Sequence, residues 1–327
     1  MLTLRSTPGN PVPPEGTLVA VRTADGRELR AAYWWPTGRV GAKGTVCLLQ
    51  GRAEFIEKYY ETIGDLRRRG FAVVAFDWRG QGESARDVAD PHKGHVGRFG
   101  HYRLDLEAVT EQVIRPRLPR PHVCLAHSMG GCVVLTGALE GWQPFERIVT
   151  LAPMLSIRMV RWPSVVSGLA RVLHRLGFGR AYVPFGSPVS IATKPYAGNR
   201  LCRDPQRYAR NAEAGRVVGA GAVGDPTLAW LAEAFRAMAR LRDPRVPPRI
   251  DLPVLIVAAG EDPVCGTRQT ERFASRLRSG RVIVLPDARH EILSERDSIR
   301  EDFWAAFDAF VPGTPVADEP PETMAAE

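Results

Sequence analysis

The sequence predicts an α/β fold in which a mostly parallel, doubly wound sheet carries a helical insertion after its central strands. Three observations support this prediction. Near-continuous apolar runs, of the kind buried on both faces of a sheet, recur along the chain. Segments with helical spacing alternate with these runs, which is typical of a parallel sheet. The alternation stops between about residues 154 and 248, where the chain is arginine-rich, helical in spacing and interrupted by Pro and Gly.

The first expected elements are a hairpin and a strand–helix–strand unit. Residues 17–34 contain two β-rich runs on either side of an Ala-Asp-Gly turn. The apolar runs at 45–50 and 71–78 are predicted strands. Residues 54–69 between them have the spacing of an amphipathic helix, which ends at Gly70.

The same alternation of apolar runs and segments with helical spacing predicts the remaining elements. The expected helices are 99–114, 129–139, 267–278 and 295–311, and the expected strands are 122–127, 147–153, 252–260 and 281–286. These elements assign residues 1–153 and 249–311 to an α/β core and residues 154–248 to a helical cap, or lid. Residues 312–327 are rich in Pro, Ala and acidic residues, and we expect a disordered tail there.

Composition excludes several classes of protein. The 327 residues are 44% hydrophobic and 24% charged, which fits a globular chain and not a disordered, collagen-like or repeat protein. No stretch approaches the roughly 18 apolar residues of a membrane span. Residues 1–14 lack the apolar region of a secretory signal, so we expect a cytoplasmic protein. The five cysteines have no metal-ligand spacing, which argues against a disulfide framework and a zinc site.

Positive charge is concentrated in one part of the chain. Between residues 156 and 216 there are eleven Lys or Arg residues and two acidic residues, whereas the net charge of the whole chain is +8. A single basic segment favours one face turned toward an anionic partner, such as a membrane surface, over nucleic-acid binding.

The strongest candidate for chemistry is Ser128, in the sequence Ala-His-Ser-Met-Gly-Gly between a predicted strand and a predicted helix. A nucleophile on such a sharp turn needs small residues two positions to either side, because the backbone there is strained and crowded. Ala126 replaces the first glycine of the usual G-x-S-x-G pattern. The backbone N–H of Met129 would point at a developing oxyanion. An ordinary serine N-cap is the alternative, and the flanking elements favour the nucleophile.

A nucleophilic serine needs a base and an acid that orients the base. His290 is the histidine on a loop after the last predicted strand, where the edge of the sheet would bring it over Ser128. Asp262 directly follows the preceding strand, and Pro263 fixes a turn there. Glu261, one residue earlier, is the competing acid. The chain order Ser, Asp, His is that of α/β-hydrolases.

Several segments together resemble the α/β-hydrolase group that contains lysophospholipase L2, monoacylglycerol lipases and serine aminopeptidase S33-like hydrolases. The resemblance covers about residues 40 to 310. Its motifs are Gln-Gly-Arg-Ala-Glu at 50–54 with Lys58-Tyr59, Asp-Trp-Arg-Gly-Gln-Gly-Glu-Ser at 77–84, His-Ser-Met-Gly-Gly at 127–131, and His-Glu-Ile-Leu at 290–293 with Glu295. The segments 204–211 and 226–231 look like the cap of the lysophospholipase L2 branch.

The resemblance implies the α/β-hydrolase fold with Ser128, Asp262 and His290 as the catalytic triad. It also implies that the backbone N–H groups of Arg52 and Met129 form the oxyanion hole. The expected reaction is hydrolysis of a carboxylic ester through an acyl-enzyme, on a lysophospholipid or a monoacylglycerol, without a metal or organic cofactor. A peptidase or general esterase of the same fold is an alternative, and so is a non-catalytic scaffold.

The cap carries a further hypothesis about substrate and membrane contact. Trp162 and several apolar residues after it recur at helical spacing, alongside Arg158, Arg161, Arg171 and Arg175. In one interpretation the apolar stripe packs on the core and the arginines face water. In the other, the apolar face lines an acyl pocket and the arginines meet phosphate head groups or an anionic bilayer. The second interpretation predicts a peripheral protein at the inner face of the membrane.

Overall fold

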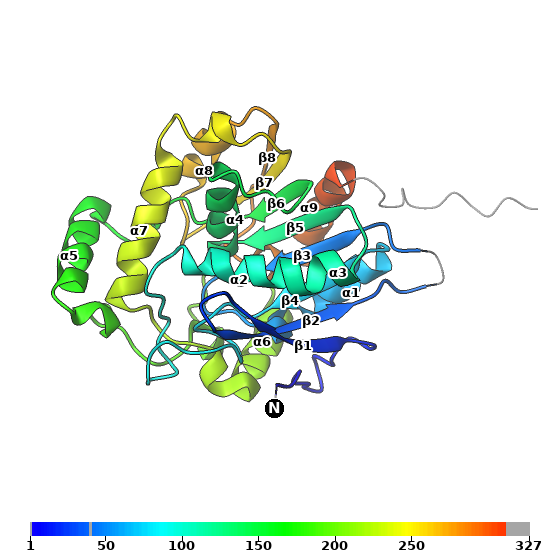
Figure 1. The fold of residues 1–327 in the computed structure, drawn as a ribbon, viewed down its shortest axis with the longest axis horizontal. Helices are drawn as coiled ribbons and strands as arrows, with labels where there is room; N and C mark the ends of the chain where they lie inside the picture. Colours follow the sequence, from blue (N-terminus) through cyan, green and yellow to red (C-terminus); the bar gives the residue numbers. More distant parts are fainter. Residues whose placement is uncertain (1, 39–40, 312–327) are drawn as a thin grey trace, which may run out of the picture.

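One eight-stranded sheet forms the centre of the molecule (Figure 1). The computed structural model describes residues 2–38 and 41–311, so the expected tail at 312–327 lies outside the described residues. The strands are β1 (Thr17–Arg22), β2 (Glu28–Trp34), β3 (Thr45–Leu49), β4 (Ala72–Phe76), β5 (His122–His127), β6 (Arg147–Leu151), β7 (Val254–Ala259) and β8 (Gly280–Leu285). Their order across the sheet is β1-β2-β4-β3-β5-β6-β7-β8. Both pairings of β2 are antiparallel and the other five are parallel, which confirms the predicted sheet.

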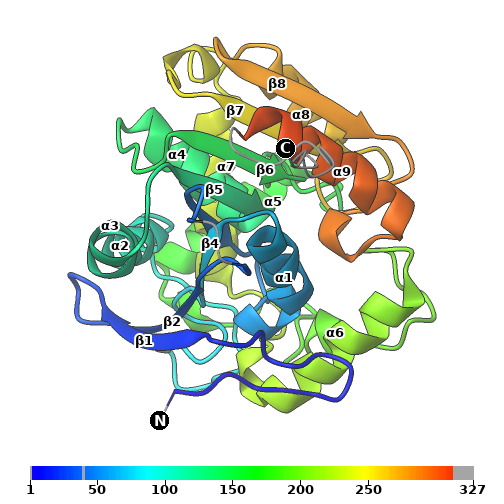
Figure 2. The same cartoon turned by 90° about the vertical axis from the view of Figure 1, so that its right-hand side faces the viewer.

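Helices cover both faces of this sheet (Figure 2). The helices of the expected core are α1 (Tyr60–Arg68), α2 (His101–Val109), α3 (Arg115–Arg117), α4 (Met129–Leu139), α8 (Thr267–Ala274) and α9 (Asp297–Phe310). A short π-helical segment, Thr110–Ile114, joins α2 to α3. The chain alternates strand and helix because each parallel strand needs a crossover to return to the same edge.

Alternate residues of the central strands enter two separate apolar cores. Val46 and Leu48 pack toward α1 and α9, whereas their neighbours Cys47 and Leu49 pack toward α2 and α4. A strand buried on both faces must be apolar at every position, which explains the unbroken runs in the sequence. Because the core sits on both faces, the ends of the strands are left as the place for a site.

The described residues between β6 and β7 form helices and connecting segments, without a strand of the sheet. The helices are α5 (Pro163–Arg175), α6 (Pro205–Val218) and α7 (Leu228–Arg242). Asp204 caps α6 by accepting two backbone N–H groups, and Thr227 caps α7 by accepting one. The helical character of residues 154–248 is as expected, and their assignment to a separate cap domain stays a prediction.

Helix α5 stands at the outer edge of the molecule and packs against α7 (Figure 1). One side of α5 turns inward, where Ala170 is buried and Val166 and Leu173 are half-buried. A second, adjacent side exposes more than half of each of five apolar residues, namely Trp162, Val165, Leu169, Val172 and Leu176. The interpretation that the apolar stripe packs on the core is therefore wrong, because α7 covers one side of this helix and the second side stays exposed. None of the described helices is both long enough and apolar enough to cross a membrane.

Candidate active site

Ser128 lies on a sharp turn between β5 and α4, with a backbone φ of 48°. A positive φ is strained for a residue with a Cβ, so the surrounding structure must hold it. The Ser128 N–H donates to the Leu151 carbonyl (3.0 Å), and the Ser128 carbonyl accepts the Met154 N–H (2.9 Å). A Cβ at Gly130 would lie 2.5 Å from the Leu49 carbonyl oxygen, so the second position after the serine has room only for glycine.

Three side chains that are distant in sequence form one hydrogen-bonded chain at this edge of the sheet. Nε2 of His290 lies 3.0 Å from Oγ of Ser128, and Nδ1 of His290 lies 2.8 Å from Oδ2 of Asp262. All three side chains are buried. Since Nδ1 donates to the carboxylate, Nε2 is free to accept the serine proton, which is the tautomer that a general base needs. The structure thus brings together the three residues expected from the sequence.

His290 donates its Nδ1–H to Asp262 and not to the competing acid Glu261. The Glu261 side chain is 55% exposed and pairs with Arg203. Asp262 uses its other oxygen, Oδ1, to accept the backbone N–H groups of Val264 (2.7 Å) and Cys265 (2.9 Å). These two hydrogen bonds fix the carboxylate in front of the imidazole.

Two backbone N–H groups stand beside the turn. Met129 is the first residue of α4, and the first N–H groups of a helix have no acceptor within the helix. The Arg52 N–H, in the loop after β3, has no acceptor among residues 2–38 and 41–311. Gly51 brings this loop close to the turn, since a Cβ there would lie 2.9 Å from Nδ1 of His127. Both N–H groups are therefore available as donors near Ser128, and their role in an oxyanion hole stays a prediction.

A buried polar network lies behind Ser128. Its residues were not among those predicted from the sequence to take part in the reaction. Oε2 of Glu54 accepts the Gly51 N–H and the Tyr59 hydroxyl (2.6 Å), and it lies 3.1 Å from Nδ1 of His127. Nε2 of His127 lies 3.1 Å from the backbone carbonyl of His290. The network therefore ties together the loop of Arg52, the residue before the serine and the backbone of the histidine loop.

The charges of this network balance one another. Burial alone would raise the pKa of Glu54, but the nearby cations Lys58 and His127 hold it well below its usual value. Burial opposes protonation of His127, and the Glu54 carboxylate outweighs that effect and raises its pKa. Lys58 bridges Glu54 (2.7 Å) and Glu291 (2.8 Å). Two sequence signals could have revealed the network, namely the i,i+4 spacing of Glu54 and Lys58 and the place of its residues in the motifs that carry the family resemblance.

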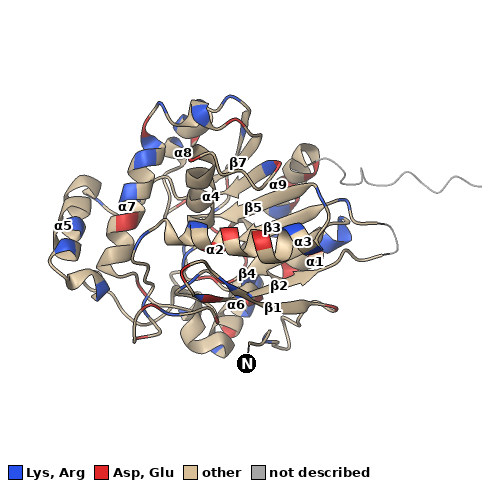
Figure 3. Cartoon of the chain, viewed as in Figure 1, with Lys and Arg blue, Asp and Glu red and all other residues tan. Residues whose placement is uncertain are grey.

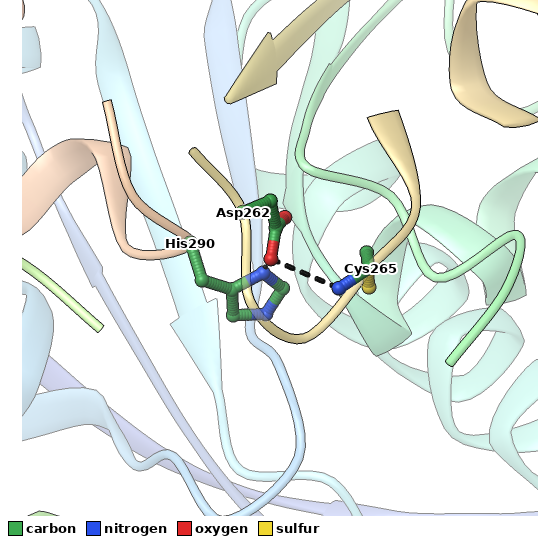
Figure 4. Close-up of side chains that lie close together, drawn as sticks. All are labelled: Asp262, Cys265 and His290. Carbon is green, nitrogen blue, oxygen red and sulfur yellow. Dashed lines mark hydrogen bonds and ion pairs between the residues drawn. The ribbon is translucent and has the colours of Figure 1, made fainter. Parts of the chain in front are cut away.

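Cys265 is a neighbour of the site that sequence spacing did not reveal. Figure 4 shows it beside Asp262 and His290, and the potential ligand atoms of these three residues lie within 4.8 Å of one another. Both carboxylate oxygens and both ring nitrogens already make hydrogen bonds, so hydrogen bonding accounts for the cluster. Burial raises the pKa of the Cys265 thiol well above its usual value, which keeps the thiol protonated.

The cap candidates divide into two groups. Arg158 lies at the site, where its N–H donates to the Val264 carbonyl (2.7 Å) and its Nη1 to the Asp262 carbonyl (3.0 Å). The other four are exposed and lie on α5 or directly before it, namely Arg161, Trp162, Arg171 and Arg175. Helix α5 itself stands at the outer edge of the molecule and carries Lys or Arg residues (Figure 3). The structure does not bring these four to Ser128.

Comparisons with known proteins agree with the fold. A family model described as "Serine aminopeptidase, S33" matches residues 41–297. The chain is 35% identical to lysophospholipase L2 from Escherichia coli (strain K12) over 271 residues, 78% of this chain and 76% of the relative. It is 28% identical to monoglyceride lipase from Rattus norvegicus over 151 residues, 46% of this chain and 47% of the relative.

Solved structures show the same architecture. A soluble variant of monoglyceride lipase from Saccharomyces cerevisiae superposes with a TM-score of 0.69 at 18% identity, covering 90% of this chain and 95% of that one. A monoacylglycerol lipase from Paleococcus ferrophilus superposes with a TM-score of 0.67 at 22% identity, covering 88% and 99%. The chain belongs to the serine aminopeptidase S33 family of α/β-hydrolases and is a serine hydrolase.

Proposed function

We propose that this protein hydrolyses the carboxylic ester bond of a lysophospholipid or a monoacylglycerol, with Ser128 as the nucleophile. The observation that carries the proposal is the continuous hydrogen-bonded chain from Ser128 through His290 to Asp262 on a strained turn. Relatives named lysophospholipase L2 and monoglyceride lipase support a lipid ester as the substrate. Hydrolysis of a peptide or a simple ester by the same site is the alternative.

The reaction follows from the positions of these groups. Nε2 of His290 takes the proton of Ser128 as Oγ attacks the ester carbonyl, while Asp262 holds the imidazole and stabilises its positive charge. The backbone N–H groups of Arg52 and Met129 stabilise the tetrahedral oxyanion. His290 then protonates the leaving alcohol. Water attacks the acyl-enzyme with His290 again as base, which releases the fatty acid and restores Ser128.

A serine-directed phosphonate tests this proposal. We expect the purified protein to be labelled at Ser128, located by mass spectrometry of its peptides, because the buried imidazole activates that hydroxyl. On a panel of lysophospholipids, monoacylglycerols, p-nitrophenyl esters and aminoacyl amides, we expect the esters to be hydrolysed faster. An unlabelled Ser128 would indicate a scaffold, and faster cleavage of the amides would favour a peptidase.

We further propose that the exposed face of α5 rests on an anionic membrane surface. Its five exposed apolar residues follow the spacing of one helix face, and three exposed arginines, Arg161, Arg171 and Arg175, lie on the helix or directly before it. An apolar face combined with basic residues is the pattern of helices that lie in the interface of a bilayer. Contact with the inner face of the membrane and location in the cytoplasm stay predictions.

Replacing Arg161, Arg171 and Arg175 together by Gln is expected to weaken sedimentation with anionic vesicles. Each basic residue near such a surface contributes about 1 kcal/mol, so the loss at low salt should be roughly 100-fold. Arg158 is kept, because it donates to the Asp262 carbonyl. Turnover of a neutral soluble ester should barely change.

A second triple variant provides the matched control for net charge. Arg68, Arg245 and Arg278 are at least 65% exposed and lie outside α5. Replacing these three by Gln changes the net charge equally and should leave vesicle binding close to that of the wild type. Equal vesicle binding by both triple variants would contradict a docking face on α5.

A further inference from the structure

The side chain of Arg52 is a cation with few partners beside the candidate active site. Its Nη1 donates to the Gly224 carbonyl (2.7 Å), and its Cζ lies 5.7 Å from the centre of the Trp230 ring. Within the described ranges 2–38 and 41–311, no carboxylate oxygen lies within 4.0 Å of its nitrogens. A guanidinium has five N–H donors, and one of them accounts for the hydrogen bond in the structure.

Two other enclosed arginines of this protein, Arg30 and Arg86, have more partners than Arg52. Arg30 is completely buried and pairs with Glu57 and Asp77. Arg86 donates to four backbone carbonyls. An enclosed charge is costly unless partners compensate it. Arg52 has fewer partners than Arg30 and Arg86, so its guanidinium has N–H donors available for a ligand.

The acidic groups nearest to Arg52 are engaged elsewhere. Asp225 attracts the guanidinium from beyond ion-pair distance, and its Oδ2 accepts the Ser187 N–H (2.9 Å). Glu54 is held by the cations and donors of the buried network. Burial lowers the pKa of Arg52, but an arginine stays charged at neutral pH.

The position of Arg52 links this charge to the reacting ester. Its backbone N–H is the expected oxyanion donor of the loop after β3. Its side chain runs from that loop to Gly224 and Trp230 in the segment expected to form the cap. An ester whose carbonyl oxygen is held by the Arg52 N–H therefore lies within one side-chain length of a partly free guanidinium.

We propose that the Arg52 side chain binds the phosphodiester group of a lysophospholipid while the backbone N–H of the same residue holds the ester carbonyl. The inference rests on the proposed ester hydrolysis at Ser128. Planar guanidinium donors match phosphate oxygens in pairs, which makes arginine the usual partner of such a group. A monoacylglycerol has no phosphate and cannot use this contact. Arg52 thus sets a preference for lysophospholipids over monoacylglycerols.

The variant Arg52→Gln tests the proposal, because it keeps the backbone N–H and an amide donor for Gly224 but removes the charge. The substrates are lysophosphatidylglycerol and a monoacylglycerol with the same acyl chain, both below their micelle-forming concentrations. We expect kcat/KM for the lysophospholipid to fall by about 10- to 100-fold, the range of a charged hydrogen bond. The value for the monoacylglycerol should change by less than about threefold. Arg52→Lys, which keeps the charge without the planar donors, should fall between the two.

Arg86→Gln is the matched control, since Arg86 also donates to the expected cap, at the Ala220 carbonyl. It should change the rates on both substrates by the same factor. An equal loss on both substrates in Arg52→Gln would overturn the proposal, because it would show a structural tether, and so would no loss on either substrate.

Binding of glycerophosphoglycerol, measured by calorimetry, separates this inference from the proposed function because it needs no turnover. We expect the wild type to bind it more tightly than Arg52→Gln does. Equal binding by the two proteins would overturn the role of Arg52. If the wild type hydrolyses neither ester, but Arg52→Gln still binds glycerophosphoglycerol more weakly than the wild type does, the proposed function alone would be overturned.

Discussion

Replacing Ser128 by Ala is expected to lower kcat for a short p-nitrophenyl ester by a factor on the order of 10⁶, with the fold retained. The substitution removes the one oxygen that faces Nε2 of His290, and no other hydroxyl among the described residues makes that contact. The buried thiol of Cys265 is close to the site, but burial keeps it protonated and therefore a poor nucleophile. Steady-state kinetics over several substrate concentrations measure the change.

A second buried serine provides the control for this substitution. The hydroxyl of Ser294 accepts a hydrogen bond from Asn211 (3.0 Å) and faces neither His290 nor Asp262. Ser294→Ala should keep most of the activity, and circular dichroism should show both variants folded. If Ser128→Ala retained a tenth of the wild-type rate, Ser128 would not be the nucleophile.

The sequence could predict the sheet because burial on both faces leaves a clear pattern. The apolar runs at 45–50 and 71–78 became β3 and β4 within two residues at either end. The turn at Ser128 was predictable for a related reason, since a strained turn against the end of β3 admits only glycine at position 130. Such constraints act locally, and they can be read from neighbouring residues.

Other features depend on contacts that spacing does not encode. Val166 and Val165 are adjacent and both fit the apolar spacing of α5, yet Val166 packs inward and Val165 is 66% exposed. Which side of a helix is covered depends on its neighbours, and α5 has α7 on one side. Likewise, the sequence shows that Arg52 is charged but not which acceptors surround it. Only the three-dimensional structure shows that the Arg52 guanidinium has one hydrogen-bond acceptor, the Gly224 carbonyl, and that the carboxylates lie farther away.

Replacing Asp262 by Asn is expected to lower kcat by a factor on the order of 10⁴ while leaving stability almost unchanged. The amide oxygen of Asn can still accept the N–H groups of Val264 and Cys265, which Asp262 now holds with Oδ1. That orientation turns the amide NH₂ toward Nδ1 of His290, which must then accept a hydrogen bond. The ring proton moves to Nε2, where it faces Ser128 and prevents the imidazole from acting as a base.

The matched control is Glu261→Gln, one residue earlier in the same loop. It removes one negative charge next to Asp262, yet the Glu261 side chain is exposed and contacts Arg203, so kcat should change by less than about twofold. The loss in Asp262→Asn is a change of tautomer, so it should appear in kcat, with a smaller effect on KM. A larger loss in Glu261→Gln than in Asp262→Asn would contradict this assignment, because it would mean that the exposed carboxylate turns inward to hold His290 in the working enzyme.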